Sequence, residues 1–81
     1  MAWLAVKNDS SIPCISVYAD EKRIFTDILK GSMSEYAFFP YESISFFVYD
    51  NFNKPVFNSI IFASSYKKQV ISIGDGWLYL S

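Results

Sequence analysis

The chain has no histidine, one cysteine, three glycines and three prolines among its 81 residues. Without histidine, Ser-His-Asp and Cys-His catalysis and histidine-ligated metal sites are excluded. A lone cysteine cannot form a disulfide within the chain. Apolar runs such as Phe46–Tyr49 and Ile60–Ala63 are far shorter than a membrane-spanning helix. The sequence therefore predicts a protein that is not an enzyme, with no metal or cofactor and no membrane span.

Charge is also scarce. Seven Lys and Arg residues stand against eight Asp and Glu residues, which gives a net charge of −1. Binding to a phosphate backbone needs a basic excess, so we expect no nucleic-acid partner. Only five apolar residues separate Met1 from Lys7, and no basic residue precedes them. This is not the pattern of a secretory signal, so we expect a cytoplasmic location.

Apolar and aromatic residues are abundant by contrast. Hydrophobic residues make up 52% of the chain and aromatic residues 20%, with eight Phe, six Tyr and two Trp. That composition is too apolar for disorder, and the length allows one core. The sequence predicts a single domain over residues 1–81.

Short segments with period-two alternation recur about every ten residues. The segment Glu21–Leu29 has helical as well as strand periodicity, but its β-branched residues and its neighbours favour a strand. The expected strands are Trp3–Val6, Cys14–Ala19, Ile24–Ile28, Ser34–Phe39, Ser43–Asp50, Val56–Ala63, Tyr66–Ile73 and Trp77–Leu80. Turn-forming residues separate them, among them Ser64-Ser65 and Gly74-Asp75-Gly76. The pattern predicts an all-β fold, a small antiparallel β-sandwich of seven to eight short strands.

The most regular strands predict the core. Their inward set is Ile15, Val17, Ile44, Phe46, Val48, Ile71 and Ile73. Gly31 and Gly74 interrupt strand patterns where the chain must reverse. We expect both glycines to serve the backbone, and at least one to have a positive φ.

Several strands are apolar on both faces, more than one small core can bury. Bulges and edge strands are one way to bury the surplus. The other is an exposed interaction patch, for which the candidates are Tyr18, Phe25, Phe47 and Tyr49. The sequence favours the patch, and hence a structural or protein-interaction module that forms a homo-oligomer or binds a protein partner.

A second surface could bind a carbohydrate. Trp3, Trp77 and Tyr79 lie near the two termini, where the ends of a sandwich can come together. Aromatic rings stack on sugar faces, but Asp75 is the only obvious polar group beside them. A small carbohydrate- or cell-envelope-binding module is therefore the alternative function.

The order of several short motifs resembles a bacterial family. The segment Val6–Lys22, VKNDSSIPCISVYADEK, resembles the opening of domain-of-unknown-function family 4397, approximately V-x-N-A-S-P-D-A-P-x-V-D-V-Y-V-D-G-K. Further segments follow in the order of that family: Phe25–Ile28, Gly31–Tyr36, Phe39-Pro40, Phe47–Tyr49 and Tyr66–Gly74.

This resemblance covers about Val6–Asp75. It implies an immunoglobulin- or transthyretin-like sandwich in a family often found in envelope and surface proteins, which leaves such a location open. Two positions depart from the family: Ser16 replaces an acidic residue, and Pro40-Tyr41-Glu42 replaces a P-A-G turn. The family has no established activity, so the resemblance implies no catalytic residue.

Overall fold

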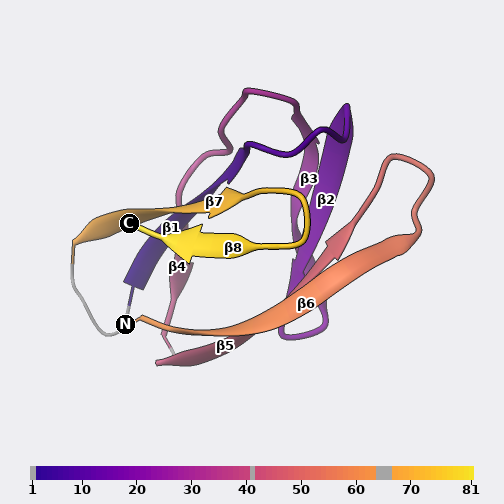
Figure 1. The fold of residues 1–81 in the computed structure, drawn as a ribbon. Coiled ribbons are helices and arrows are strands. Elements are labelled where there is room, and N and C mark those ends of the chain that lie inside the picture. The colour runs from indigo at the N-terminus through magenta and orange to yellow at the C-terminus, as the bar shows by residue number, and fades with distance from the viewer. Residues whose placement is uncertain (1, 41, 64–66) are drawn as a thin grey trace.

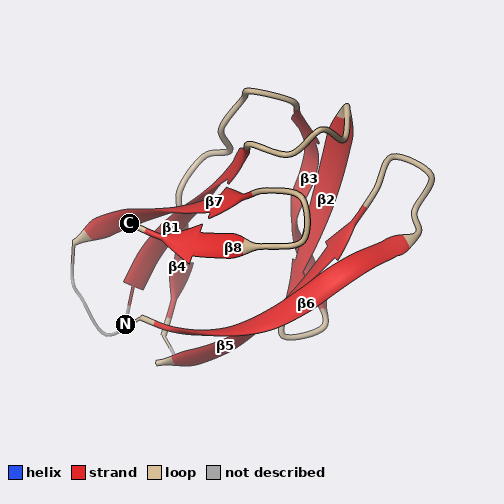
Figure 2. Cartoon of the chain, in the orientation of Figure 1, coloured by secondary structure: helices blue, strands red, loops and turns tan. Residues whose placement is uncertain are grey.

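The computed structural model describes residues 2–40, 42–63 and 67–81. Over these residues the fold is all-β, as predicted, with eight strands and no helix (Figure 2). The strands are β1 (Ala2–Asn8), β2 (Cys14–Ala19), β3 (Lys22–Leu29), β4 (Ala37–Phe39), β5 (Ser43–Tyr49), β6 (Pro55–Phe62), β7 (Lys68–Ile73) and β8 (Leu78–Leu80). The predicted turn at Ser64-Ser65, the predicted strand start at Tyr66 and Tyr41 lie outside the described residues.

The strands form two four-stranded sheets, ordered β4-β1-β7-β8 and β3-β2-β5-β6. Figure 1 shows the two layers, with β6 and β8 as edge strands. Every pairing between strands is antiparallel except β1 with β7, which run parallel in register from Trp3↔Lys68 to Asn8↔Ile73. That pair departs from the antiparallel fold we predicted. The two strands are far apart in sequence. Alternation of apolar residues within each strand does not indicate whether two distant strands run parallel or antiparallel.

The inner sides of both sheets contribute to one apolar core. All seven predicted core residues are buried there, none more than 1% exposed. Three phenylalanine rings form part of this core: Phe46 lies 6.5 Å from Phe25 and 6.0 Å from Phe39, measured between ring centroids. Aromatic pairs at such distances stabilise a fold beyond the area they bury.

Strand β3 corrects one prediction. Phe25 was expected to face outward, but it is only 3% exposed and lies opposite Val17. The pairing of β2 with β3 shifts register twice, and Asp27 has a φ of +53°. A β-bulge adds a residue to one strand and reverses which side chains face inward beyond it. Phe25 and Ile28, three residues apart, therefore both enter the core.

Strand β4 is shorter than the predicted Ser34–Phe39, because only Ala37–Phe39 pairs regularly with β1. Ahead of it, Ser34 contacts β1 through its own groups. The backbone N–H of Val6 donates to Ser34 Oγ at 2.8 Å, and Ser34 N donates to Val6 O. The serine hydroxyl thus takes the place of a ladder partner.

Gly31 and Gly74 were both predicted to serve the backbone. Gly31 has a φ of +81°, as expected for at least one of the two. Gly74 has no positive φ, but the indole of Trp77 occupies the space that a Cβ would fill. Any larger residue at position 74 would displace that ring.

Candidate functional site

The outer surface of the sheet β3-β2-β5-β6 carries the largest concentration of apolar side chains outside the core. We define the aromatic face as Tyr18, Phe47, Tyr49, Ile60 and Phe62. These residues come from three adjacent strands, β2, β5 and β6. They share one side because residues two apart along a strand point the same way.

The two tyrosines of the aromatic face contact each other. Tyr18 is the Cα partner of Phe47, and Tyr49 is the Cα partner of Ser16. The Tyr18 and Tyr49 rings lie diagonally across β2 and β5, 5.0 Å apart and tilted by 54°. Phe47 is 37% exposed beside them. Three of the four predicted patch residues are thus brought together, and Phe25 is not among them.

Ile60 and Phe62 extend the aromatic face to the edge strand, 57% and 75% exposed. The sequence showed that the segment containing them is apolar on both faces, but alternation alone could not say which set faces outward. Their Cα partners on β5 are Ser45 and Ser43. Pairing with outward residues of β5 settles their direction.

Charged side chains lie beside the aromatic face and not within it. Within the described strands β2, β5 and β6, every outward side chain is apolar or neutral: Cys14, Ser16, Tyr18, Ser43, Ser45, Phe47, Tyr49, Val56, Asn58, Ile60 and Phe62. Arg23 reaches in from β3, where its Nη2 donates to Ser16 Oγ at 2.9 Å. Ser16, which replaces the acidic residue of the resembled family, is 4% exposed and accepts this bond as a neutral partner.

The other sheet presents a smaller aromatic pair on its outer surface. Trp3 and Phe38 are Cα partners on β1 and β4, with ring centroids 5.2 Å apart. Lys68 is the Cα partner of Trp3 on the other side, and its ammonium lies 5.1 Å from the Tyr36 ring. Lys68 therefore lies on the strand next to Trp3, with its charge over the Tyr36 ring.

The proposed carbohydrate platform is dispersed. Tyr79 lies on β8 opposite Ser72, which is in turn opposite Lys7 on β1. Tyr79 is therefore separated from Trp3 by about 13 Å along the strands and about 10 Å across them. Trp77 lies in the turn before β8, against Gly74. The three rings do not form a single surface.

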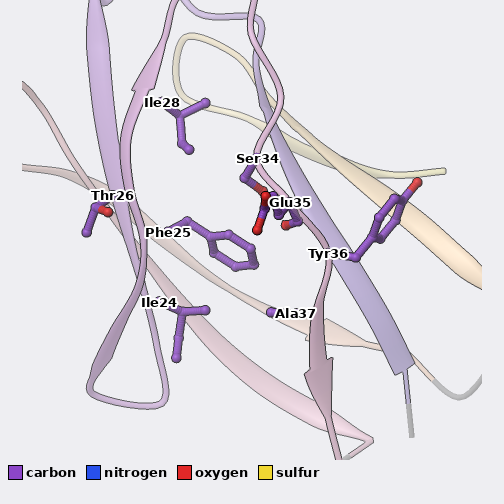
Figure 3. A pocket seen from close by; sticks show the side chains of 8 residues that line it. All are labelled: Ile24, Phe25, Thr26, Ile28, Ser34, Glu35, Tyr36 and Ala37. Atoms are coloured by element: carbon purple, nitrogen blue, oxygen red, sulfur yellow. The ribbon is translucent and has the colours of Figure 1, made fainter.

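A cavity of about 370 Å³ opens between β3 and the segment that precedes β4. Figure 3 shows Phe25 and the Glu35 carboxylate turned toward this space, and Thr26 and Tyr36 turned away. A hollow of about 360 Å³ lies beside the aromatic face, lined by Asp20, Glu21, Ser45 and Phe47. In the hollow, Asp20 Oδ1 accepts a hydrogen bond from the backbone N–H of Ser45 at 2.9 Å.

Polar groups cluster instead where three loops meet. Asn8 is completely buried, and its amide nitrogen donates to Ile12 O at 3.1 Å and Ile28 O at 3.0 Å. Its side-chain oxygen accepts from both the backbone N–H and the hydroxyl of Ser10. We call Asn8, Ser10, Ser11 and Asp75 the loop cluster. Its hydrogen bonds connect the loop after β1 to β3 and to the β7–β8 turn.

Asp75 links the β7–β8 turn to the loop after β1. Its Oδ1 accepts from the backbone N–H and the hydroxyl of Ser11, each at 2.9 Å. These bonds favour the ionised carboxylate, first the backbone bond and then the hydroxyl, and they lower the pKa of Asp75 below 3.8. Cys14 shows the opposite effect, because burial and the nearby Asp27 carboxylate raise the pKa of its thiol.

Among residues 2–40, 42–63 and 67–81, no three Cys, Asp or Glu side chains are grouped so that they could hold a metal ion. Across the same ranges, no helix has the length and apolarity needed to cross a membrane. Comparisons with known proteins match no family model, no curated protein and no solved structure.

Proposed function

We propose that this chain is a non-enzymatic interaction module that self-associates through the aromatic face. One observation carries the proposal: five aromatic or aliphatic side chains from three neighbouring strands gather on one outer surface, with no charged side chain among them. Apolar patches of several hundred Å² on soluble proteins mark sites of interaction. Aromatic residues in such patches supply most of the binding energy when they are buried against a partner.

Self-association is favoured over a polar ligand by the chemistry of this surface. Its neutral polar groups are the serines, Asn58 and the hydroxyls of Tyr18 and Tyr49. Arg23 is held at Ser16, and Asp20 and Glu21 lie beside Phe47. A carbohydrate needs several hydrogen-bonding groups beside the aromatic rings, whereas a second copy of the same surface needs only complementary apolar area. The dispersed positions of Trp3, Trp77 and Tyr79 give the carbohydrate alternative less support.

The test replaces Phe47 and Tyr49 together by serine. Both side chains lie on the aromatic face, while Phe46 and Val48 on the same strand lie in the core. We expect the double variant to stay folded by circular dichroism and to lose the oligomer in sedimentation velocity. An oligomer that persists unchanged in the folded variant would contradict the proposal.

A matched control is available on the opposite sheet. Trp3 and Phe38 also form an exposed aromatic pair across two strands, 43% and 47% exposed. Replacing both by serine removes a similar apolar area beside Lys68. We expect this control to retain the oligomer, which would separate a loss of one specific surface from a general loss of hydrophobicity.

We also propose that the two sheets form an immunoglobulin- or transthyretin-like sandwich related to family 4397. The proposal is supported by the shared core between two four-stranded sheets and by the motif order from Val6 to Asp75. An experimental structure compared with that of a family member tests it. A different strand order there would contradict the relationship.

A further inference from the structure

The four edge strands differ in how well they are protected against pairing with another chain. Strands β4 and β8 have only three residues each. Strand β3 carries bulges and the charged residues Lys22, Arg23 and Asp27. Strand β6 runs for eight residues without a charged side chain, and its pairing with β5 is regular from Phe57 to Phe62. Short length, bulges, proline and charge are the usual protections of an edge. Pro55 and the register shift at Val56 protect only the start of β6, and the remainder, Phe57–Phe62, has none of these protections.

The unpaired backbone groups of β6 can be assigned from its neighbours. On β5, Ser45 N donates to Asp20 Oδ1 and Ser45 O accepts from Asp20 N, so its backbone groups point toward β2. The backbone N–H and C=O groups of successive residues point to opposite sides of a strand. Because those of Ser45 point toward β2, those of the even-numbered residues of β5 point toward β6 and bond to its odd-numbered residues. The N–H and C=O groups of Asn58, Ile60 and Phe62 therefore point away from the sheet.

We infer that β6 pairs antiparallel with β6 of a second copy, across a two-fold axis at Ser59. The inference rests on the proposed self-association with a second copy, but it places the contact at the edge of the sheet, as an alternative to contact through the aromatic face. Only registers that place even-numbered residues opposite even-numbered ones match the free backbone groups. The two-fold at Ser59 is such a register, and it makes the contact isologous.

Side chains favour this register. It places Phe57 opposite Ile61 of the second copy, Ser59 opposite Ser59 and Val56 near Phe62, while Asn58 lies opposite Ile60. Like-natured pairs across neighbouring strands stabilise a sheet. The two aromatic faces would then lie on the same side of one continuous eight-stranded sheet, with no charge between them.

The size of the contact predicts a reversible dimer. Phe57 and Phe62 can each bury up to roughly 150–250 Å². Four such rings in a pair reach on the order of 600–1,000 Å², below the roughly 1,200 Å² typical of stable interfaces. We therefore expect the dimer fraction to rise with protein concentration.

A single-cysteine experiment tests the register. In a Cys14→Ser background, Ser59→Cys places two thiols opposite each other at a non-hydrogen-bonded position, where Cβ atoms lie about 4.5–5.5 Å apart. Mild oxidation should give a disulfide-linked dimer at least tenfold faster than Val56→Cys, whose thiols would lie about 20 Å apart. Equal rates for the two variants would overturn the register.

A backbone variant tests the edge independently of the aromatic face. Asn58→Pro removes an outward N–H from the middle of β6, a position where an edge strand tolerates proline, and we expect it to sediment as a monomer with an unchanged fold. Asn58→Ala, which changes the same side chain and keeps the N–H, is the control and should retain the dimer. Dimers that persist in Asn58→Pro would overturn the inference.

The same assays separate this inference from the proposed function. If Phe47→Ser with Tyr49→Ser removes the dimer while Asn58→Pro keeps it, the aromatic face is the contact and the edge pairing is wrong. If Asn58→Pro removes the dimer, Ser59→Cys cross-links and the face variant keeps the dimer, the edge pairing is correct and the face is not the contact. A wild-type protein that is monomeric at every concentration would overturn both.

Discussion

The loop cluster and the aromatic face both depart from the usual arrangement of a folded protein, in which polar side chains are exposed and apolar ones are buried. In the loop cluster, the polar groups of Asn8 and Ser10 are buried and hydrogen-bonded to other parts of the chain. On the aromatic face, apolar side chains such as Ile60 and Phe62 are exposed. Partners within the chain indicate a structural role for the first region. Exposed apolar groups without such partners point to an interaction surface for the second.

Strand β5 shows the same contrast between adjacent residues. Phe46 is fully buried between Phe25 and Phe39, whereas Phe47 is 37% exposed. Both side chains have the same volume, so only their surroundings differ. Stability and association should therefore respond to different residues of one strand.

The largest expected effect is that of Phe46→Ala. Loss of a buried phenylalanine costs roughly 3–5 kcal/mol, a large share of the roughly 5–15 kcal/mol available to a domain. Phe47→Ala should change the free energy of unfolding by less than about 1 kcal/mol. Urea denaturation of both variants measures the difference. A Phe46→Ala protein that melts within a degree or two of wild type would contradict the assignment of the core.

The loop cluster should be intermediate in effect. Asn8→Ala removes the hydrogen-bond partner of several buried groups. Each group left without a partner should lower the free energy of unfolding by about 1–3 kcal/mol. Asn58→Ala, at an exposed position of β6, is the control and should stay within about 0.5 kcal/mol of wild type. Hydrogen exchange should also rise near Ile12 and Ile28, whose carbonyls Asn8 holds. Equal stability of the two variants would show that the cluster contributes nothing.

The smallest effect is the acid sensitivity that Asp75 contributes. Its pKa is lowered in the folded protein, so its stabilising effect is complete above 3.8 and is lost as the pH falls through the folded value. Between about pH 5 and pH 2, the urea midpoint of wild type should therefore fall further than that of Asp75→Asn. Parallel curves for the two proteins would show that the bonds to Ser11 do not affect folding.

Local pattern was enough to predict much of this molecule. Alternation in Cys14–Ala19 and Ser43–Tyr49 identified two strands and the inward set that includes Phe46 and Val48. A positive φ was predicted for at least one of Gly31 and Gly74 from their places at chain reversals, and Gly31 has it. Each of these depends on side-chain chemistry or on neighbours a few residues away.

Other features were decided only by the tertiary structure. The parallel pairing of β1 with β7 joins strands about 65 residues apart, and no local period encodes such a contact. The bulges in the β2–β3 pairing place Phe25 in the core, because one inserted residue reverses which side of the sheet the following side chains face. Pairing with β5 set Ile60 and Phe62 outward, while the sheet order separated Trp3 from Tyr79. The sequence thus determined which residues could be buried, and the meeting of distant strands decided which of them were.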